Sequence, residues 1–357
     1  MAGMTPSRLH FVDTVGSAWS VPDTPPQPAR VECRAPEEAD APTVACRDRK
    51  ALDMHPRPLP DDLPPRFAVA QAVASGATRG RLRAGDLRAP HHGLRALGGP
   101  PVDLEERCLE LVPALREGHL FSHVTALALW GLPLPTRYVR GGAPLHVSAV
   151  GRREPRRPGV VGHRLSPHLL PGVAPPPALV PPVLAWVQSA ALLTLDELVV
   201  VGDALAGRWS NRQEARCVPV AQLRSATEHD PRRPGAARLR EAVEWVRAGV
   251  ESPKETEVRL LLVRAGLPEP ELNVPTHGAD GAYLGRPDLR WAEHGVTLEY
   301  EGSHHRDDPH VYAQDIDRRE RFEDHGWSVV RCIAAHLVPP RDVELVARVH
   351  RRLARHR

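Results

Sequence analysis

The sequence has almost no lysine and no long apolar run. Only two of its 357 residues are lysine, Lys50 and Lys254, so arginine supplies nearly all of the positive charge. With 47 basic and 44 acidic residues the net charge is +3, which by itself does not indicate a nucleic-acid partner. The arginine bias is expected of a GC-rich genome, although the arginine fork also suits phosphate and guanine well.

Cysteine is scarce as well. The sequence contains five scattered cysteines: Cys33, Cys46, Cys108, Cys217 and Cys332. No pair has metal-ligand spacing, and an odd number without a framework favours reduced thiols. No stretch approaches the roughly 18 apolar residues of a membrane span, and the N-terminus lacks the pattern of a signal peptide. We therefore expect a cytoplasmic protein that has no membrane partner.

The N-terminal segment 1–62 is rich in Pro, Ala and charged residues and shows little periodicity. This composition predicts a disordered extension. Met54 lies directly before the first ordered pattern, so a second hypothesis is that translation starts there. Mass spectrometry of the native N-terminus distinguishes the two starts.

Segment 63–100 predicts a winged helix-turn-helix. Phe67–Ala74 reads as a short helix, Thr78 as the cap of a basic second helix, and the following residues as a hairpin that turns at His92–Gly93. The functional interpretation places three arginines against DNA phosphates: Arg79, Arg81 and Arg83. The alternative is a solvated basic helix.

Segment 101–175 predicts a small α/β domain, and segment 176–250 a helical connector. A strand is expected at Leu145–Val150, followed by a basic loop and another strand. The loop holds the densest basic cluster of the chain: Arg152, Arg153, Arg156 and Arg157. This cluster is either a solvated surface or a phosphate contact. Asp203 reads as a capping or packing residue.

Segment 251–357 predicts an α/β unit with a mixed sheet flanked by helices. Ser252 to Glu255 reads as a capping box with Pro253 at the first helical position. The order that follows is helix, strand, strand, helix, strand, helix. The predicted fold class of the whole chain is therefore α/β, in an α+β multidomain arrangement.

Two carboxylates in this last segment suggest a metal site. Val296, Leu298 and Tyr300 alternate with acidic and polar residues, which predicts a strand, and Asp288 lies just before a neighbouring strand. If the strands pair through a turn at His294–Gly295, Asp288 and Glu299 approach each other. Such a pair suits Mg²⁺ or Mn²⁺. Acidic residues on an exposed hairpin edge are the alternative.

Two groups of motifs resemble known bacterial families. Residues 251–357 hold SPKETEVRLLLVRAGLPEPELN, GRPDLRW, VTLEYEGSHH and GWSVVR. This set resembles uncharacterised proteins whose C-terminal domain is similar to very-short-patch-repair endonucleases, within the PD-(D/E)XK, restriction-endonuclease-like fold. Upstream, FAVAQAVASGATRGRLRAG, APHHGLRAL and SHVTALALWGLPLP resemble the N-terminal part of AbiEi-type antitoxins.

The resemblance implies roles for individual residues. Asp288 and Glu299 would be the acidic metal ligands, completed by the backbone carbonyl of Tyr300. Glu255 matches an acidic residue that lies near the metal through water, although a capping residue needs no such role.

Further roles follow from the same resemblance. His305 matches a candidate general base or leaving-group acid. Arg318 and Arg306 would hold substrate phosphates, and Asp315 would orient His305 or Arg318.

The chain departs from the family pattern at Glu301. Relatives usually have Asp there, and the Lys of the PD-(D/E)XK motif is absent because Glu301 stands two residues after Glu299. Either His305 replaces this Lys or hydrolysis is lost. Three hypotheses remain: a metal-dependent DNA endonuclease of repair or defence, a non-catalytic DNA-binding antitoxin-like regulator with a vestigial nuclease fold, and a module that binds a toxin or nucleotidyltransferase partner.

Overall fold

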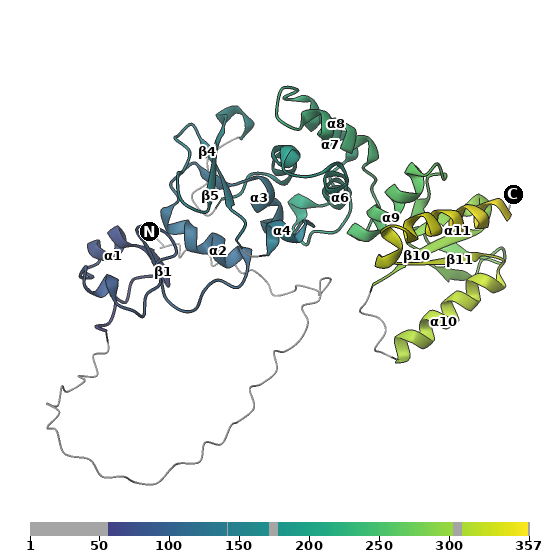
Figure 1. Ribbon diagram of the computed structural model, residues 1–357, viewed down its shortest axis with the longest axis horizontal. Helices are drawn as coiled ribbons and strands as arrows, with labels where there is room; N and C mark the ends of the chain where they lie inside the picture. The colour runs from purple at the N-terminus through teal and green to yellow at the C-terminus, as the bar shows by residue number, and fades with distance from the viewer. Residues whose placement is uncertain (1–55, 141, 171–177, 303–308, 356–357) are drawn as a thin grey trace, which may run out of the picture. The chain divides into compact units, whose positions relative to one another are not determined.

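A computed structural model describes residues 56–140, 142–170, 178–302 and 309–355, and the side chains of residues 309–316 lie outside the description. Most of the predicted N-terminal extension and the alternative start at Met54 fall outside these residues. The described chain is a mixed α/β protein in which helices accompany small antiparallel and mixed sheets (Figure 1). This confirms the predicted α/β class. None of the described helices is long and apolar enough to span a membrane.

The first described region is small and has little regular structure. Its elements are β1 (Arg66–Ala68), α1 (Val69–Ala74), the 3₁₀ turn η1 (Arg81–Arg83) and β2 (Leu94–Ala96). Strands β1 and β2 pair antiparallel, so Phe67 lies in a strand and the predicted helix begins only at Val69. The predicted hairpin is wrong in its first strand, which is reduced to an isolated bridge between Arg88 and Ala96. The predicted turn is present, with Gly93 at a positive φ of 78° that favours glycine. The predicted basic second helix is only one 3₁₀ turn, since its RGRLRAG sequence contains two glycines.

The second region contains a three-stranded sheet. Its elements are α2 (Leu104–Leu111), η2 (Val112–Ala114), β3 (His119–Phe121), α3 (His123–Leu129), α4 (Thr136–Val139), β4 (Leu145–Val150), β5 (Val160–Leu165) and η3 (Pro167–Leu169). The predicted strand Leu145–Val150 is confirmed, and it lies in the middle of the sheet, antiparallel to β3 and parallel to β5. Both faces of β4 are buried, and each face contributes to a different hydrophobic cluster.

The third region is helical, as expected from the sequence. It comprises α5 (Pro182–Gln188), η4 (Ser189–Ala191), α6 (Leu195–Ala206), η5 (Gln213–Ala215), α7 (Val220–Glu228) and α8 (Ala236–Trp245). Helix α6 begins at a capping box in which Thr194 and Glu197 exchange hydrogen bonds. Apolar residues of these helices join residues of the preceding sheet in one large cluster, centred on the fully buried Trp186.

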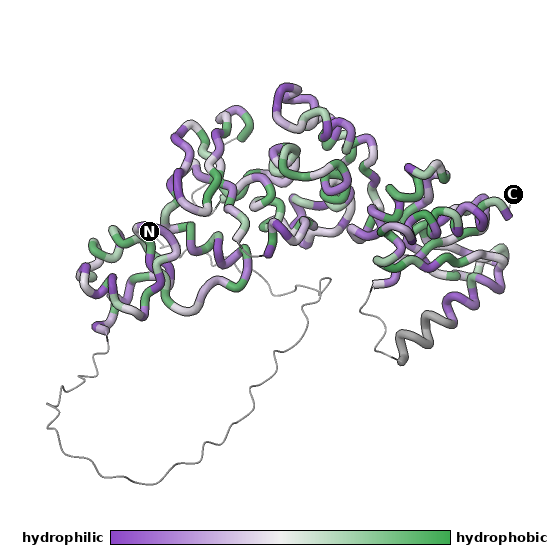
Figure 2. The backbone as a smooth tube through the Cα atoms, viewed as in Figure 1, coloured by the Kyte–Doolittle hydropathy of each residue, from purple (hydrophilic) through white to green (hydrophobic). Residues whose placement is uncertain are grey.

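The fourth region holds the candidate site. It comprises α9 (Pro253–Arg264), β6 (Glu271–Leu272), β7 (Thr276–His277), β8 (Tyr283–Gly285), β9 (Leu289–Trp291), η6 (Ala292–His294), β10 (Val296–Glu301), α10 (Pro309–Asp324), β11 (Ser328–Ile333), η8 (Ala334–Leu337) and α11 (Arg341–Arg355). The main sheet has the order β11-β10-β9-β6, in which only β10 and β11 are parallel. Helices α9 and α11 pack on one face of this sheet, whereas α10 is hydrophilic over its described half (Figure 2).

A buried ion pair joins α6 to α9. Arg259 Nη2 lies 3.1 Å from Asp203 Oδ2, and both side chains are almost fully buried. Thr256 and the backbone N–H of Arg247 also donate to the Asp203 carboxylate. Burial raises the pKa of Asp203 to about 6 against the lowering effect of Arg259. Asp203 is thus a packing residue, as the sequence suggested.

Candidate functional site

Asp288 and Glu299 lie across from each other at one end of β9 and β10. Leu289 pairs with Leu298 in the antiparallel register, so the next residues outward are Asp288 and Glu299. Side chains alternate between the two faces of a strand. Leu289 and Leu298 point into the hydrophobic cluster, so the two carboxylates share the opposite face. The predicted hairpin and its approach of carboxylates are therefore present, with Gly295 in the left-handed conformation at the turn.

Asp288 is held in a partly dry position. Its Oδ2 accepts a 2.7 Å hydrogen bond from the backbone N–H of Tyr300. Burial raises the pKa of Asp288 to about 6, the Tyr300 bond lowers it, and the charge of Glu299 raises it further. The charges of the two carboxylates therefore repel each other, and a hard cation between them would relieve that repulsion.

Glu255 approaches the same region from α9. Burial raises the pKa of Glu255 to about 7, and the charge of Asp288 adds to this rise. The predicted capping box is only half formed. Ser252 Oγ accepts the Glu255 N–H, but the Glu255 carboxylate accepts from the N–H of Glu251 rather than from that of Ser252.

Asn273 links Glu255 to Asp288. Its Nδ2 donates to Glu255 Oε2 at 2.6 Å and to the carbonyl of Gly249, while its N–H donates to the carbonyl of Asp288. The backbone of Asn273 has a positive φ of 50°, which few residues other than Gly, Asn and Asp adopt. Sequence reasoning missed this residue. Its position in the quoted PEPELN motif and its tolerance of the left-handed conformation were the available signals.

The three carboxylates do not form a compact cage. Among the described residues, the carboxylates of Glu255, Asp288 and Glu299 are not a group whose ligand atoms all lie within 4.8 Å of one another. Glu255 is instead connected to Asp288 through Asn273. The residues that fit a cation directly are Asp288 and Glu299, with Glu255 in a supporting position.

Arg318 contacts the face of the sheet that carries Asp288 and Glu299, which we call the carboxylate face. Its Nη2 lies 2.7 Å from Glu299 Oε2, and Glu299 is mostly buried. The resemblance assigned this arginine to substrate phosphate, and the structure places it beside a metal-ligand candidate instead. A guanidinium there partly neutralises Glu299 in the absence of a cation.

The position of the missing motif lysine is negatively charged. Glu301 forms an ion pair with Arg331 of the parallel strand β11. Lys254, the only lysine of this segment, lies on α9 and pairs with Glu257 at 2.6 Å. Among the described residues, the positively charged side chains paired with Glu299 and Glu301 are therefore arginines, which hold phosphate well but do not act as general acids or bases at neutral pH.

Several predicted site residues cannot be placed. His305 and Arg306 lie outside the described residues. Asp315 lies within α10, but its side chain is outside the description. Tyr300 lies next to both carboxylates in the sheet, and its backbone N–H contacts Asp288.

The three N-terminal arginines differ in their surroundings. Arg79 and Arg83 are exposed. The Arg81 guanidinium is mostly buried and forms a two-point ion pair with Asp86, at 2.9 and 2.7 Å. Arg81 therefore holds the fold together, whereas Arg79 and Arg83 are available to a ligand.

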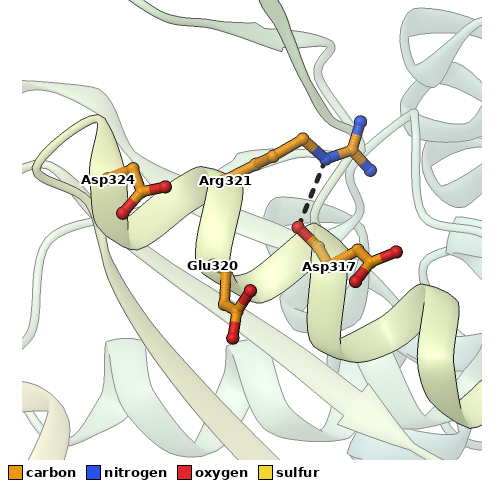
Figure 3. A pocket seen from close by; sticks show the side chains of 4 residues that line it. All are labelled: Asp317, Glu320, Arg321 and Asp324. Atoms are coloured by element: carbon orange, nitrogen blue, oxygen red, sulfur yellow. Dashed lines mark hydrogen bonds between the residues drawn. The ribbon is translucent and has the colours of Figure 1, made fainter.

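Two surface hollows have opposite charge. One, of about 560 Å³, is lined by three arginines of the predicted basic cluster together with Arg164: Arg152, Arg153 and Arg156. Glu154 forms ion pairs with Arg156 and Arg164. The other lies on α10 and is lined by Asp317, Glu320, Arg321 and Asp324 (Figure 3). The basic hollow suits phosphate, while an acidic helix face is common without a ligand.

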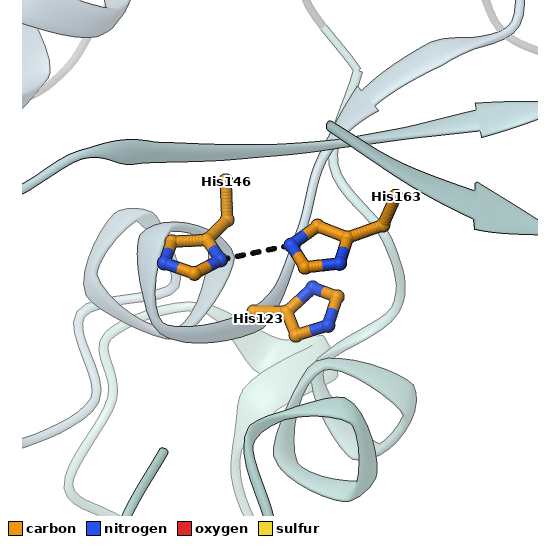
Figure 4. Close-up of side chains that lie close together, drawn as sticks. All are labelled: His123, His146 and His163. Atoms are coloured by element: carbon orange, nitrogen blue, oxygen red, sulfur yellow. Dashed lines mark hydrogen bonds between the residues drawn. The ribbon is translucent and has the colours of Figure 1, made fainter. Parts of the chain in front are cut away.

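Sequence reasoning also missed a histidine cluster in the three-stranded sheet region. His123, His146 and His163 come from α3, β4 and β5 and bring their rings together (Figure 4). The three residues are separated by 23 and 17 positions, so no local motif links them. Only the pairing of β4 with β5 and the packing of α3 reveal the cluster.

Comparison with known proteins gives two relatives. The uncharacterised proteins MT2308 and Rv2248 of Mycobacterium tuberculosis are each 30% identical to this chain over 154 residues, which is 43% of this chain and 56% of each relative. The chain thus spans about half the length of these relatives, and their names state no activity. No family model matches the chain, and no solved structure matches it.

Proposed function

We propose that this protein is a metal-dependent DNA endonuclease that hydrolyses phosphodiester bonds at Asp288 and Glu299. The observation that carries the proposal is the register of β9 and β10, which sets these two carboxylates side by side on one face of a mixed sheet. The order of α9, β9, β10, α10, β11 and α11 supports the restriction-endonuclease-like fold expected from the sequence. The N-terminal β1–η1–β2 region would be the DNA-binding winged-helix part.

The residues of this face suit phosphodiester chemistry. Asp288 and Glu299 would hold Mg²⁺ or Mn²⁺, and Glu255 with Asn273 would support Asp288 from α9. When bound, the cation supplies a positive centre for the developing phosphorane charge and lowers the pKa of a coordinated water.

The remaining steps fall to arginine and histidine. Arg318 is 2.7 Å from Glu299, and when a cation neutralises Glu299 its guanidinium would turn to a substrate phosphate. The proton transfers need a group that titrates near neutrality, and His305 is the candidate that the resemblance supplies. The exposed Arg79 and Arg83 and the basic hollow would add salt-dependent DNA affinity.

A cleavage assay tests the proposal. The full chain is incubated with supercoiled plasmid and short mismatched duplexes, with Mg²⁺, Mn²⁺ or EDTA. Asp288→Asn and Glu299→Gln run beside Glu293→Gln, an exposed acidic residue of the same region. Metal-dependent nicking that the first two substitutions abolish and the third leaves intact supports the endonuclease. Cleavage that survives Asp288→Asn and Glu299→Gln contradicts it.

A second candidate is a non-catalytic, antitoxin-like DNA-binding regulator. It is favoured by the lack of a motif lysine and by the two ion pairs, Glu299 with Arg318 and Glu301 with Arg331, that already neutralise the carboxylate face. Salt-dependent binding of the same duplexes without any cleavage in Mg²⁺ or Mn²⁺ would favour this regulator.

A further inference from the structure

Three histidines converge in the three-stranded sheet region. One ring nitrogen of each of His123, His146 and His163 can be chosen so that all three lie within 4.8 Å of one another. His146 Nδ1 and His163 Nε2 are 2.9 Å apart, and the ring of His123 stacks on that of His163 at 3.7 Å (Figure 4). His146 is buried and the other two are partly buried.

The strand register explains why the rings meet. In the parallel pairing of β4 with β5, His163 is opposite Ser148, and His146 precedes Ser148 by two residues on the same face. Val150 and Leu165 continue this face into the largest hydrophobic cluster. Three polar rings thus stand at the end of an otherwise apolar layer.

His123 is placed on this layer by an unusual backbone conformation. It is the first residue of α3 and has a positive φ of 54°. Ser122, in the N-cap position, makes no side-chain capping bond, and its Oγ lies 2.9 Å from His123 Nδ1 instead. Strained backbone of this kind persists where the surroundings fix it, and it is frequent at ligand sites.

Ser148 supplies an independent observation. Its side chain is fully buried on the histidine face, and among the described residues its Oγ has no hydrogen-bond partner. A buried hydroxyl normally has a partner in the protein or an ordered ligand. The described residues therefore leave the buried Ser148 hydroxyl on this face without a hydrogen-bond partner.

We propose that His123, His146 and His163 bind one transition-metal ion, best fitted by Zn²⁺, and leave a fourth position for water or an anion. Three imidazoles with an open position are a common zinc ligand set. Nitrogens that share one zinc at about 2.0–2.1 Å lie roughly 3.3 Å apart. The His146–His163 pair at 2.9 Å is already near that spacing, and the stacked ring of His123 would have to turn its nitrogen toward the ion. Nitrogen ligands without carboxylates favour Zn²⁺ over Mg²⁺.

Arg233 bears on the fourth ligand. Burial lowers the pKa of His123, and the positive charge of the partly buried Arg233 adds to this lowering. Since the cluster itself contributes no negative charge, a divalent ion beside this arginine favours an anionic fourth ligand such as hydroxide or phosphate. Simple packing of neutral imidazoles is the competing explanation, and it predicts no metal affinity.

Zinc titration of the full chain tests the proposal. The protein is stripped with EDTA, dialysed, and titrated with Zn²⁺ against a chromophoric chelator. We expect the unsubstituted protein to bind about one Zn²⁺ per chain. In His146→Gln and in His163→Gln the affinity for Zn²⁺ should fall roughly 100-fold. His168→Gln is the matched control, because this histidine of the same region is exposed, forms a hydrogen bond with Ser166 and is not part of the cluster.

The outcomes separate this site from the carboxylate face. Binding that persists in the Asp288→Asn and Glu299→Gln double variant supports the histidine cluster. Binding that is equally strong in His163→Gln, or absent from the unsubstituted protein, overturns the proposal. X-ray absorption of the zinc-loaded unsubstituted protein needs no variant: nitrogen neighbours at about 2.0–2.1 Å are expected, and an all-oxygen shell would contradict the assignment.

Discussion

The carboxylate face and the histidine cluster each bring together side chains that could bind a metal ion, but the two groups differ in charge. The carboxylate face gathers hard oxygen ligands whose charges repel, and this repulsion helps to raise the pKa of Asp288 and Glu255. The histidine cluster gathers nitrogen ligands that burial keeps neutral, with the pKa of His146 lowered to about 4. A group of carboxylates is destabilising until a cation arrives, whereas neutral imidazoles are tolerated without one.

The difference also shows in the counter-charges. Arg318 and Arg331 pair with Glu299 and Glu301 on the carboxylate face. Burial lowers the pKa of His123, the charges of His163, His146 and Arg233 lower it further, and no carboxylate is among these groups. Under the two proposals, the first face would take a hard divalent cation and phosphate, and the second a softer metal with an anionic ligand.

The largest expected effect concerns the buried ion pair that anchors α9 to α6. Arg259→Met should lower the free energy of unfolding by about 3–5 kcal/mol, because it leaves the buried Asp203 carboxyl without its ionic partner. Urea unfolding measures this. Arg264→Met is the matched control on the same helix: its pair with Asp196 is partly exposed, so a change of less than about 1 kcal/mol is expected. Equal effects of both substitutions would contradict the structural role of Arg259.

The second prediction separates the two candidate metal sites. Asp288→Asn should reduce Mg²⁺-dependent cleavage by roughly 100-fold or more, because the positive centre for the phosphorane charge is lost. Protein stripped of metal and given Mg²⁺ alone should cleave as fast as protein given Mg²⁺ and Zn²⁺ together. Single-turnover cleavage rates measure both effects. If cleavage required Zn²⁺ absolutely, both regions would take part in catalysis, and the proposed separation of the two metal sites would be wrong.

The third prediction uses the raised pKa of Glu255. Because its folded-state pKa is about 7 against an ordinary 4.5, the folded protein binds more protons than the unfolded chain between these values. The stability of metal-free protein should therefore fall as pH rises from about 4.5 to about 7 and then level off.

Glu255→Gln should remove much of this fall. The amide oxygen of Gln can still accept from Glu251 and Asn273, so at pH 8 without metal the variant should be more stable by on the order of 1–3 kcal/mol. Thermal unfolding at pH 5 and pH 8 measures the difference. A variant that is less stable than the unsubstituted protein at pH 8 would show that the Glu255 charge is already compensated.

The smallest expected effect concerns DNA affinity. Arg79→Ala and Arg83→Ala should each weaken duplex binding and reduce the slope of log affinity against log salt by about one. Arg81→Ala is the contrast, because its guanidinium is bound to Asp86. It should lower the melting temperature and leave the salt slope unchanged. Fluorescence anisotropy at several salt concentrations measures the slopes, and equal slopes for all three variants would argue against a DNA contact here.

Much of the carboxylate face could be predicted from the sequence. The alternation at residues 296–301 and the glycine at 295 specify a strand after a tight turn, and burial of one face then fixes the register. That register sets Asp288 opposite Glu299. The positions of Glu255 and Arg318 beside this pair were harder to predict. A capping motif and a polar helix have the same sequence pattern whether or not they lie next to a sheet. Asn273 and the Glu301–Arg331 pair required the fold.

The sequence alone determined the α/β class, the strand at Leu145–Val150, the helical region and the carboxylate pair, because each depends on local periodicity or on one short hairpin. Only the tertiary structure revealed the histidine cluster, the buried Asp203–Arg259 pair and the ion pair of Arg81 with Asp86. Each of these joins residues whose proximity depends on parallel strand pairing, helix packing or burial. Such contacts leave no periodic signal in the chain, since the residues between them can vary without changing which side chains meet.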